Sequence, residues 1–166
     1  MDGLQPLRAV DLEFLERAPV RHELIEPVRA PAARVFAAIS ADPSTWTWFP
    51  GLDEGGYEGD GRLGVGARRW VRMGEWTYRE TILAWDAPHR WAYRVDETSS
   101  PMFRALLEDW RIDATGAGAA QVRWTFAIDP APGTEPLLDA LPQVLGDVFR
   151  GAMQGLDAYL AAPPQD

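Results

Sequence analysis

The spacing of the apolar residues changes near residue 130, and this change constrains the fold more than any other feature of the sequence. Between residues 75 and 129 apolar and polar side chains alternate with a period of two, as in β-strands that bury one face. Turn residues, such as Ala87-Pro88 and the glycine-containing segment 115–119, divide this region into four segments. We therefore predict four successive antiparallel strands joined by short turns.

One side chain in two along each of these strands should face the core. The predicted inward face comprises Trp76, Tyr78, Glu80, Ile82, Ala84, Trp91, Tyr93, Val95, Leu106, Glu108, Trp110, Ile112, Val122, Trp124, Phe126 and Ile128. This face is strongly aromatic, and it also carries two carboxylates.

After residue 130 the apolar residues recur every three or four positions, from Leu137 to Leu160. That spacing predicts a long amphipathic helix at the carboxyl end of the chain. Thr134 is a candidate N-cap, and Pro163-Pro164 should end the helix. Pro142 should either kink the helix or separate a first short turn from it.

The first 70 residues predict shorter elements. We expect a strand from Arg21, a short helix that begins at Pro31 and ends at Asp42-Pro43, and a second helical turn over Ser44–Trp48. The glycine-rich segment 51–69 predicts turns and short strands. Residues 1–19 form an N-terminal extension with a short amphipathic helix around Val10, Phe14 and Leu15, and residues 20–162 form a single domain.

These elements predict an α+β fold in which a curved antiparallel sheet wraps around the C-terminal helix, with two short helices after the first strand. A twisted sheet curls, and a long helix can lie across its concave side. A single helix seldom fills that space completely, so the pattern also predicts a cavity between the sheet and the helix.

Composition excludes several functions. The chain has 16 basic residues, 25 acidic residues and a net charge of −9, which argues against binding to nucleic acid or to anionic lipid headgroups. It contains neither cysteine nor lysine, so disulfides, thiolate nucleophiles and Schiff-base chemistry are excluded. No apolar run approaches the ~20 residues that span a bilayer, and the N-terminus lacks the apolar region of a secretory signal. We therefore expect a cytoplasmic protein without membrane insertion.

Several segments resemble a known superfamily. The strings APAARVFAAISADPSTWTWFPGL, GVGARRW, RETILAWDAPHRWAYRV and QVRWTF are similar to the START-related lipid-transfer (SRPBCC) superfamily, and within it to the polyketide cyclase/dehydrase-like group. The resemblance covers about Val20 to Leu160. It implies the helix-grip fold and a cavity for a hydrophobic ligand. It supplies no invariant catalytic motif, because members of the superfamily include carriers, receptors, cyclases, dehydratases and cochaperones.

The aromatic residues are the candidate ligand-binding groups. These are Trp46, Trp48, Trp70, Trp76, Trp91, Tyr93, Trp110 and Trp124, joined by Phe149 and Met153 of the C-terminal helix. The alternative for each of them is simple core packing. Trp46 and Trp48 lie beside the Pro50-Gly51 turn, where the rim of a cavity is a more natural place for them than the centre of a core.

Glu80, Glu108 and Tyr78 are the candidate catalytic residues, because a carboxyl or phenol group in a dry pocket can act as a general acid or base. The alternative is that each glutamate forms a structural ion pair with Arg68, Arg72 or Arg104, or reaches water at a strand edge. His22 and His89 should be solvent-facing or at strand edges, so we expect no metal site and no cofactor.

Three functions remain open at this level. The chain could bind or carry a lipid, an aromatic compound or a polyketide-like compound; it could be a polyketide cyclase or dehydratase-type enzyme; or it could be an interaction protein like the chaperone activators of the superfamily. Gly146, Gly151 and Gly155 in the C-terminal helix indicate either close packing on the sheet or space for a ligand.

Overall fold

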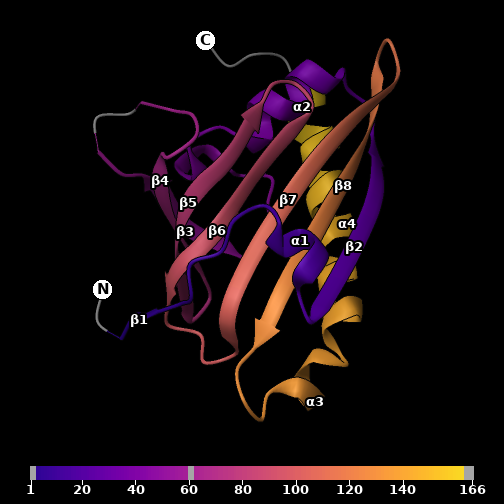
Figure 1. Ribbon diagram of the computed structural model, residues 1–166. Helices are drawn as coiled ribbons and strands as arrows, with labels where there is room; N and C mark the ends of the chain where they lie inside the picture. Colours follow the sequence, from indigo (N-terminus) through magenta and orange to yellow (C-terminus); the bar gives the residue numbers. More distant parts are fainter. Residues whose placement is uncertain (1–2, 60–61, 163–166) are drawn as a thin grey trace.

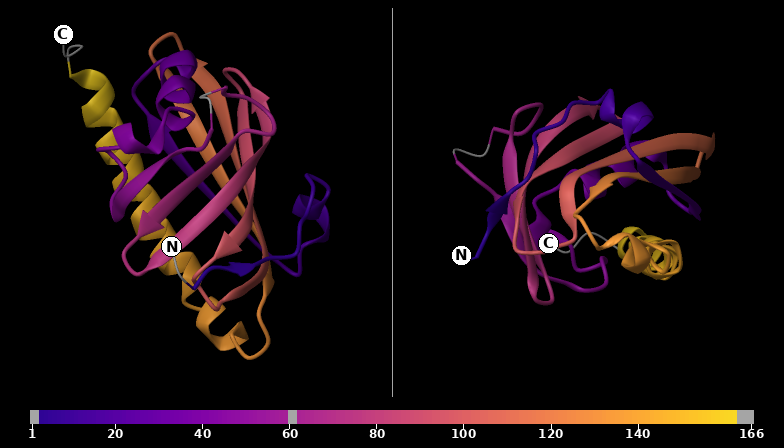
Figure 2. Two further views of the ribbon diagram at one scale, coloured as in Figure 1. Left: turned by 90° about the vertical axis from the view of Figure 1, so that its left-hand side faces the viewer. Right: turned by 60° about the horizontal axis from the view of Figure 1, so that its bottom comes forward.

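A computed structural model of the chain describes residues 3–59 and 62–162 (Figure 1). It shows a curved antiparallel sheet wrapped around a long helix, α4 (Leu141–Ala161), with short helices after the first long strand. The predicted α+β helix-grip architecture is confirmed. Figure 2 shows the sheet curling over α4, which lies along its concave side.

The sheet contains every strand that the structure describes. They are β1 (Gln5–Pro6), β2 (Val20–Val28), β3 (Leu52–Tyr57), β4 (Arg68–Met73), β5 (Trp76–Asp86), β6 (Arg90–Thr98), β7 (Phe103–Gly116) and β8 (Ala119–Pro130). The order across the sheet is β2-β8-β7-β6-β5-β4-β3, and the short β1 pairs with the end of β6. Because β2 pairs with β8, the first long strand lies beside the last one, and β3 to β8 form a continuous meander.

The predicted inward face of the meander is present in the structure except at Ala84. A bulge in β5 between Ile82 and Ala84 brings Trp85 opposite the inward Trp91, so Trp85 packs against the core in place of Ala84. Tyr93 on β6 lies opposite Glu108 on β7, which in turn lies opposite Phe126 on β8. One step along, Trp110 lies opposite Trp124, and their rings stack with centroids 4.4 Å apart. The cross-strand register therefore brings the alternate residues of successive strands into one aromatic face.

The opposite face of the sheet is buried in one place. Val10, Phe14 and Leu15 pack on Ala105, Leu107 and Ala127, which lie on the outer side of β7 and β8. The helix here, α1 (Phe14–Arg17), is a single turn in front of the sheet in Figure 1. The expectation of one buried face therefore holds only outside this patch, because the N-terminal segment covers the middle of the outer face. The division into an extension, 1–19, and a domain, 20–162, stays a prediction.

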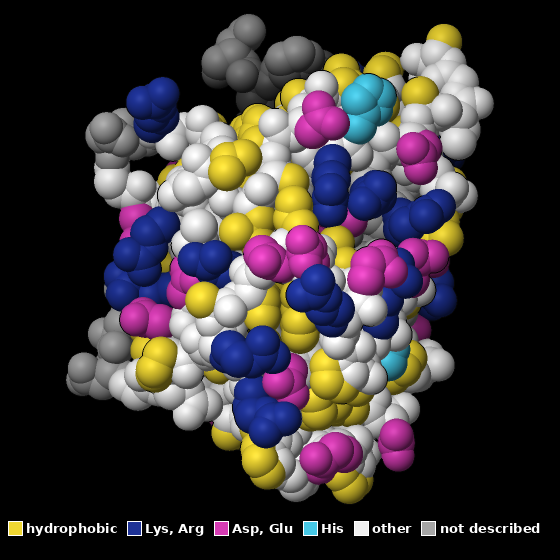
Figure 3. Space-filling view, viewed as in Figure 1, with side chains coloured by type: hydrophobic (Ala, Val, Ile, Leu, Met, Phe, Trp, Pro, Cys, Tyr) yellow, Lys and Arg dark blue, Asp and Glu magenta, His cyan; other side chains and the backbone are white. Residues whose placement is uncertain are grey.

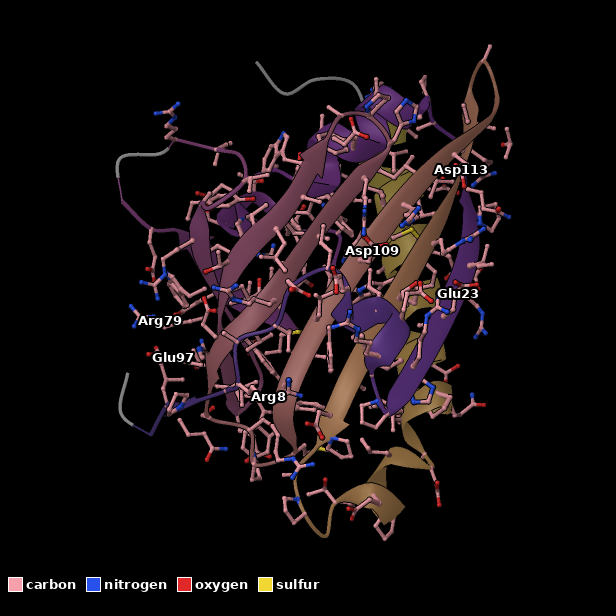
Figure 4. All side chains as sticks on the ribbon, in the orientation of Figure 1. Arg8, Glu23, Arg79, Glu97, Asp109 and Asp113 are labelled. Atoms are coloured by element: carbon pink, nitrogen blue, oxygen red, sulfur yellow. The ribbon has the colours of Figure 1, made fainter. Side chains whose placement is uncertain are left out.

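The rest of the outer face is charged, and its charges occur in pairs. Arg79 on β5 and Glu97 on β6 lie side by side, with 3.2 Å between Nη1 and Oε2 (Figure 4). The nearly buried Asp109 accepts hydrogen bonds from Arg90 at 2.6 Å and from Arg111 at 2.9 Å. Figure 3 shows acidic and basic side chains interspersed over this face. Among the described residues of this face, acidic and basic side chains therefore lie close to one another.

The short helices follow the expected positions with two differences. Helix α2 (Ala32–Ile39) begins after Pro31 but ends at Ile39, before the expected end at Asp42-Pro43. A 3₁₀ turn, η1 (Pro43–Thr45), replaces the helical turn expected over Ser44–Trp48. The side chain of Asp42 caps this turn by accepting from the backbone N–H of Ser44 at 2.9 Å. The chain leaves the helical conformation at Trp46, where ψ is 68°.

At the carboxyl end, Pro142 separates a short helix, α3 (Glu135–Leu138), from α4, as one of the two predicted outcomes. Pro142 lies in the first turn of α4. A backbone N–H at this position would have no partner within the helix, so its absence in proline has no cost. Thr134 occupies the N-cap position of α3, but its hydroxyl donates to the carbonyl of Ala131 at 2.7 Å instead of capping the helix. No helix in the described residues is both long enough and apolar enough to cross a membrane.

The two halves of α4 pack differently. Phe149, Ala152, Met153, Leu156 and Leu160 in the second half are buried against the core. The first half presents apolar side chains that are only partly covered, and Val144 is 54% exposed. The second half is therefore held tightly on the sheet, while the first half leaves space beneath it.

Candidate functional site

A cavity of about 340 Å³ lies between the concave face of the sheet and the first half of α4. The sheet contributes Arg69, Val71, Met73, Trp76, Tyr78, Glu80, Tyr93, Phe103, Leu106, Glu108, Trp110, Trp124, Phe126 and Ile128 to its wall. The loops contribute Trp46, Phe49, Ser100 and Met102, β3 contributes Leu52, and α4 contributes Leu141, Val144, Leu145 and Val148. The wall is predominantly apolar and aromatic, which is typical of small-molecule sites.

Eight of the candidate residues lie in this wall. They are Trp46, Trp76, Tyr78, Glu80, Tyr93, Glu108, Trp110 and Trp124. They come from the η1 loop and from β5, β6, β7 and β8, so the fold brings together residues that are up to 78 positions apart (124 − 46).

The other five candidates do not line the cavity. Trp91 is fully buried behind the wall, against Trp46, Tyr93 and Trp110. Phe149 and Met153 are also buried, in the tightly packed half of α4. These three residues belong to the solid core, which corrects the expectation that they line the cavity.

Trp48 and Trp70 lie outside the cavity wall for different reasons. The backbone of Trp48 lies so close to α4 that a Cβ built on Gly155 would be 2.3 Å from its carbonyl oxygen, and its ring packs on Trp46 and Phe49. Trp70 is one position out of phase with Arg69 and Val71, so it faces the other side of β4.

The polar part of the wall begins with an ion pair between Arg69 and Glu80. The two residues lie opposite each other on β4 and β5, and Nε of Arg69 donates to Oε2 of Glu80. Both side chains are almost completely buried, with 2% and 3% exposure. The ion-pair alternative for Glu80 is therefore present, but with a different arginine.

The three arginines named from the sequence have other partners. Arg104 pairs with Asp129 at 2.8 Å, Arg72 pairs with Glu54 at 3.1 Å, and Arg68 approaches Glu58 at 3.8 Å. Arg68 and Arg72 alternate with Arg69 along β4, so they lie on the outer side of the strand.

Three aromatic rings enclose the guanidinium of Arg69. Its Cζ lies 5.0 Å from the ring centroid of Trp46, 4.5 Å from that of Trp91 and 4.5 Å from that of Tyr93. Burial lowers the pKa of Arg69, but the charge of Glu80, the interactions with Tyr93 and Tyr57 and the hydrogen bond to Glu80 together outweigh this. The net pKa is raised, so the side chain keeps its charge. Among the described residues, Nη1 of Arg69 has no hydrogen-bond partner although it is buried.

Glu108 is the second buried carboxyl group of the wall. The hydroxyl of Tyr93 donates to its Oε2, and Nε1 of Trp124 donates to the same oxygen at 2.9 Å. Within the described parts of the chain, Oε1 makes no hydrogen bond. Burial and then the negative charge of Glu80 raise the pKa of Glu108 to about 8, so this carboxyl is protonated at neutral pH.

Tyr78 lies in the same wall. Burial and then the charges of Glu108 and Glu80 raise the pKa of its hydroxyl to about 12. Burial also raises the pKa of Glu80, against the attraction of Arg69. The polar groups of the cavity are therefore a charged arginine with its counter-ion, a neutral carboxylic acid and neutral phenols.

The histidines lie elsewhere. His22 is half-buried on the edge strand β2, and burial lowers its pKa. His89 is exposed in the turn between β5 and β6. In residues 3–59 and 62–162, no group of three or more acidic, histidine or cysteine side chains could hold a metal ion.

Arg69 is the important site residue that the sequence analysis missed. Its signal was available, because Arg69, Val71 and Met73 have the same alternation as the other inward residues. The glycine-rich segment before β4 obscured that pattern, and a charged residue is not expected at a buried position.

Comparison with known proteins agrees with this fold. Residues 22–161 match the family model described as polyketide cyclase/dehydrase and lipid transport. Uncharacterised proteins from Mycobacterium tuberculosis and Mycobacterium bovis are 27% identical to the chain over 161 residues, which cover 96% of this chain and 95% of each relative.

Solved structures show the same architecture at low sequence identity. A START superfamily protein from Mycobacterium smegmatis is similar with a TM-score of 0.66 and 11% identity, over 84% of this chain and 95% of that one. A protein from Thermobifida fusca has a TM-score of 0.65 and 24% identity, over 82% of this chain and 90% of that one. The family match spans most of the chain and confirms the resemblance seen in the sequence: the chain belongs to the polyketide cyclase/dehydrase and lipid-transport family.

Proposed function

We propose that the chain binds a hydrophobic small molecule in the cavity between the sheet and the first half of α4. The observation that carries this proposal is the composition of the wall, in which aromatic and aliphatic side chains surround a few polar groups gathered on β4 to β7. That combination is the usual form of a small-molecule site, with apolar area for affinity and a few polar groups for orientation.

The size of the cavity limits the ligand. At roughly 30 Å³ for each water-sized group, about 340 Å³ holds about eleven such groups. This suits a compound of two or three rings better than a lipid with two acyl chains. The partly exposed Leu141, Val144 and Leu145 at the start of α4 provide the route of entry, because this half of the helix is the less tightly packed one.

A matched pair of variants on α4 tests the proposal. Val148 lines the cavity, whereas Tyr159 is exposed on the same helix. The neutral fluorescent probe N-phenyl-1-naphthylamine should bind the wild-type protein saturably at one site. Val148→Trp fills the cavity and should weaken binding by about tenfold or more, since about 1.4 kcal/mol of lost contact is enough. Tyr159→Trp should leave the affinity unchanged.

Absence of saturable binding would contradict the proposal, as would an equal loss of affinity in both variants. Native mass spectrometry of the protein purified from its own host complements this titration, because it detects a ligand that co-purifies and gives its mass.

A second candidate function, a cyclisation or dehydration, is favoured by one observation. Glu108 is a neutral carboxylic acid in an apolar wall, and it could donate a proton to the carbonyl oxygen of a bound substrate. Glu80 is held by Arg69, and the pKa of Tyr78 is raised, so neither is a ready proton acceptor. Glu108→Gln would then abolish turnover of a poly-ketone substrate and leave binding of the probe intact. If Glu108→Gln kept both turnover and probe binding, Glu108 would have no catalytic role.

A further inference from the structure

We propose that the outer face of the sheet binds a phosphate group at a row of three arginines, Arg90 on β6, Arg111 on β7 and Arg123 on β8. The ligand class is a phosphate monoester, in which one phosphate group carries up to two negative charges. The row lies on the side of the sheet away from the cavity, so the inference does not depend on the proposed function.

The strand register places the three arginines directly opposite one another. Arg90 pairs with Arg111 across β6 and β7, and Arg111 pairs with Arg123 across β7 and β8. Figure 4 labels Asp109 and Asp113, which precede and follow Arg111 by two positions on β7. The Cβ atoms of residues at such cross-strand positions are about 4.5–5.5 Å apart, and like charges there repel each other. The row is therefore unfavourable unless negative charge is held within it.

One carboxylate of the protein compensates part of this charge. Oδ1 of Asp109 accepts from Nε of Arg90 at 2.6 Å, and its Oδ2 accepts from Nε of Arg111 at 2.9 Å. The side chain of Asp109 is only 3% exposed, whereas both arginines are partly exposed. Each arginine uses only its Nε here, and in the described chain the terminal nitrogens of both have no protein acceptor. Asp109 therefore positions two guanidinium groups whose other donors are available to a ligand.

Arg123 has no such carboxylate. Its side chain forms no ion pair or hydrogen bond with the residues that the structure describes, and its Nε is buried without an acceptor. Its cross-strand neighbours are Arg111 on one side and the apolar Ile25 on the other. A buried N–H without a partner is unfavourable, and so is a cation directly opposite another cation. An anion between Arg111 and Arg123 removes both costs.

The charge of the row fits a compact dianion. Three arginines and the carboxylate of Asp109 give a formal charge of +2 (3 − 1). A phosphate monoester carries a charge of about −1.5 to −2 at pH 7 and has three acceptor oxygens, so it can accept from more than one guanidinium at once. A carboxylate has a single charge and two oxygens in one plane, so it leaves part of the row uncompensated.

Acidic residues around the row limit the ligand to a single phosphate group. Asp86 on β5 lies opposite Arg90. Asp113 follows Arg111 by two positions, and Glu23 lies on the same face of β2. In the described chain none of these carboxylates forms an ion pair with the row. They repel a polyanion or a strongly anionic membrane surface, which brings further negative charge against them, but they leave room for one compact anion.

Three soluble probes with similar carbon skeletons test the inference: glycerol 3-phosphate, glycerate and glycerol. All three are too polar for the apolar cavity, and NMR spectra of the ¹⁵N-labelled protein follow their binding at about pH 7.5, where the phosphate is a dianion. Glycerol 3-phosphate should shift the signals around Arg90, Arg111 and Arg123 with a Kd of about 1 mM or lower. Glycerate should bind about tenfold more weakly, and glycerol should cause no shifts there.

Arg123→Met and Arg21→Met form a matched pair of variants. Arg21 lies on the same face of β2, opposite Ala127, and it already pairs with Glu23 at 3.4 Å. Arg123→Met should weaken glycerol 3-phosphate binding by about tenfold or more, whereas Arg21→Met should leave it unchanged. Since Arg123→Met removes a cation beside Arg111, the free variant should melt no lower than the wild type. If it does not fold, the wild-type shifts decide: shifts centred on the row support the site, and shifts elsewhere overturn it.

Vesicles of phosphatidylcholine that contain phosphatidic acid separate a lipid headgroup from a soluble phosphate, because phosphatidic acid carries the same monoester. We expect glycerol 3-phosphate to bind and the vesicles not to bind. Binding to the vesicles alone, if Arg123→Met abolished it, would support phosphate recognition and assign it to a lipid. If neither probe binds, if glycerate binds as tightly, or if Arg123→Met changes nothing, the inference is overturned and the proposal for the cavity is unaffected.

Discussion

At the scale of single residues, the inner face of the sheet is largely apolar but buries a few ionisable side chains. Three kinds of contact hold these side chains. Arg69 is paired with Glu80, its faces are covered by aromatic rings, and Glu108 is held by Tyr93 and Trp124. Each contact reduces the cost of burial, yet Nη1 of Arg69 has no hydrogen-bond partner in the part of the chain that the structure describes. Such unfavourable burial of a polar group is common at binding sites, because a bound ligand can supply the missing partner.

The buried Glu108 predicts a specific dependence of stability on pH. Its pKa is about 8 in the folded protein, against the ordinary value of 4.5. Between these values the folded state holds a proton that the unfolded state has lost, so the free energy of unfolding should fall as the pH rises from about 4.5 to about 8. The slope is at most about 1.4 kcal/mol per pH unit.

Glu108→Gln removes this titration but keeps an acceptor for Tyr93 and Trp124. Urea unfolding of both proteins from pH 4.5 to pH 9 should show the wild type losing stability relative to the variant up to about pH 8, with a constant difference above it. A difference that does not depend on pH would show that Glu108 has an ordinary pKa.

The ion pair beside it predicts a non-additive pair of mutations. Arg69→Met alone leaves the carboxylate of Glu80 buried without a partner, so we expect a loss of about 3–5 kcal/mol. Adding Glu80→Met removes that carboxylate, and the double variant should recover most of the stability. Thermal or urea unfolding of the wild type, both single variants and the double variant completes the cycle. Equal stability of the single and the double variant would contradict the coupling.

At the scale of elements, alternation along β5 to β8 predicted which residues face the helix, because a sheet with one packed face repeats every two residues. It failed at Ala84, because the bulge in β5 after Ile82 changes the phase of the alternation. The same rule placed Glu80 and Glu108 inward from the sequence alone. The rule also applies to Arg69, but the glycine-rich segment before β4 obscured the alternation there. The pairing of Arg69 with Glu80 depends on the register of β4 and β5, which the sequence does not give. It also could not show that residues 10–15 cover the outer face, since that contact joins distant parts of the chain.

The three glycines of α4 are a further case in which the sequence alone does not determine the packing. Sequence alone left open whether they allow close packing or leave space, and the structure gives a different answer for each end. A Cβ on Gly155 would lie 2.3 Å from the carbonyl oxygen of Trp48, whereas a Cβ on Gly146 would meet nothing within 4 Å. Close packing thus belongs to Gly155, whereas the position of a Cβ on Gly146, which does not line the cavity, is open.

This difference predicts opposite effects of the same substitution. Gly155→Ala must push α4 away from Trp48, so we expect a loss of about 1–3 kcal/mol. Gly146→Ala gains helix propensity without a clash and should stabilise the protein by about 0.5–1 kcal/mol. The two variants serve as controls for each other in thermal unfolding. If Gly146→Ala destabilised the protein as much as Gly155→Ala does, the space around Gly146 would be smaller than the structure shows.

At the scale of the whole molecule, the sheet separates two kinds of packing. The helix and the cavity lie on its concave side, and the N-terminal segment lies on its convex side, where Arg8 also reaches Asp129 at 2.8 Å (Figure 4). The backbone of the same segment bonds to two strands, from Leu7 to Asp96 on β6 and from Arg8 to Arg104 on β7, both at 2.8 Å. The segment therefore joins β6 and β7 beyond Arg94 and Leu107, where the direct pairing of the two strands ends.

Removal of residues 1–17 tests whether these two sides are independent. The deletion exposes the outer patch on β7 and β8, whose Leu107 and Ala127 are fully buried in the intact chain, so the melting temperature should fall by several degrees. The inner face keeps Glu80, Glu108 and the stacked tryptophans, so N-phenyl-1-naphthylamine should still bind with an affinity within about threefold of that of the full chain, a change of less than 1 kcal/mol. Arg17→Ala, at a residue whose side chain is 73% exposed, controls for a change of sequence in this segment without loss of packing. A truncated chain that unfolds completely would show instead that residues 1–19 are an integral part of the domain, because the sheet would then depend on support from both of its faces.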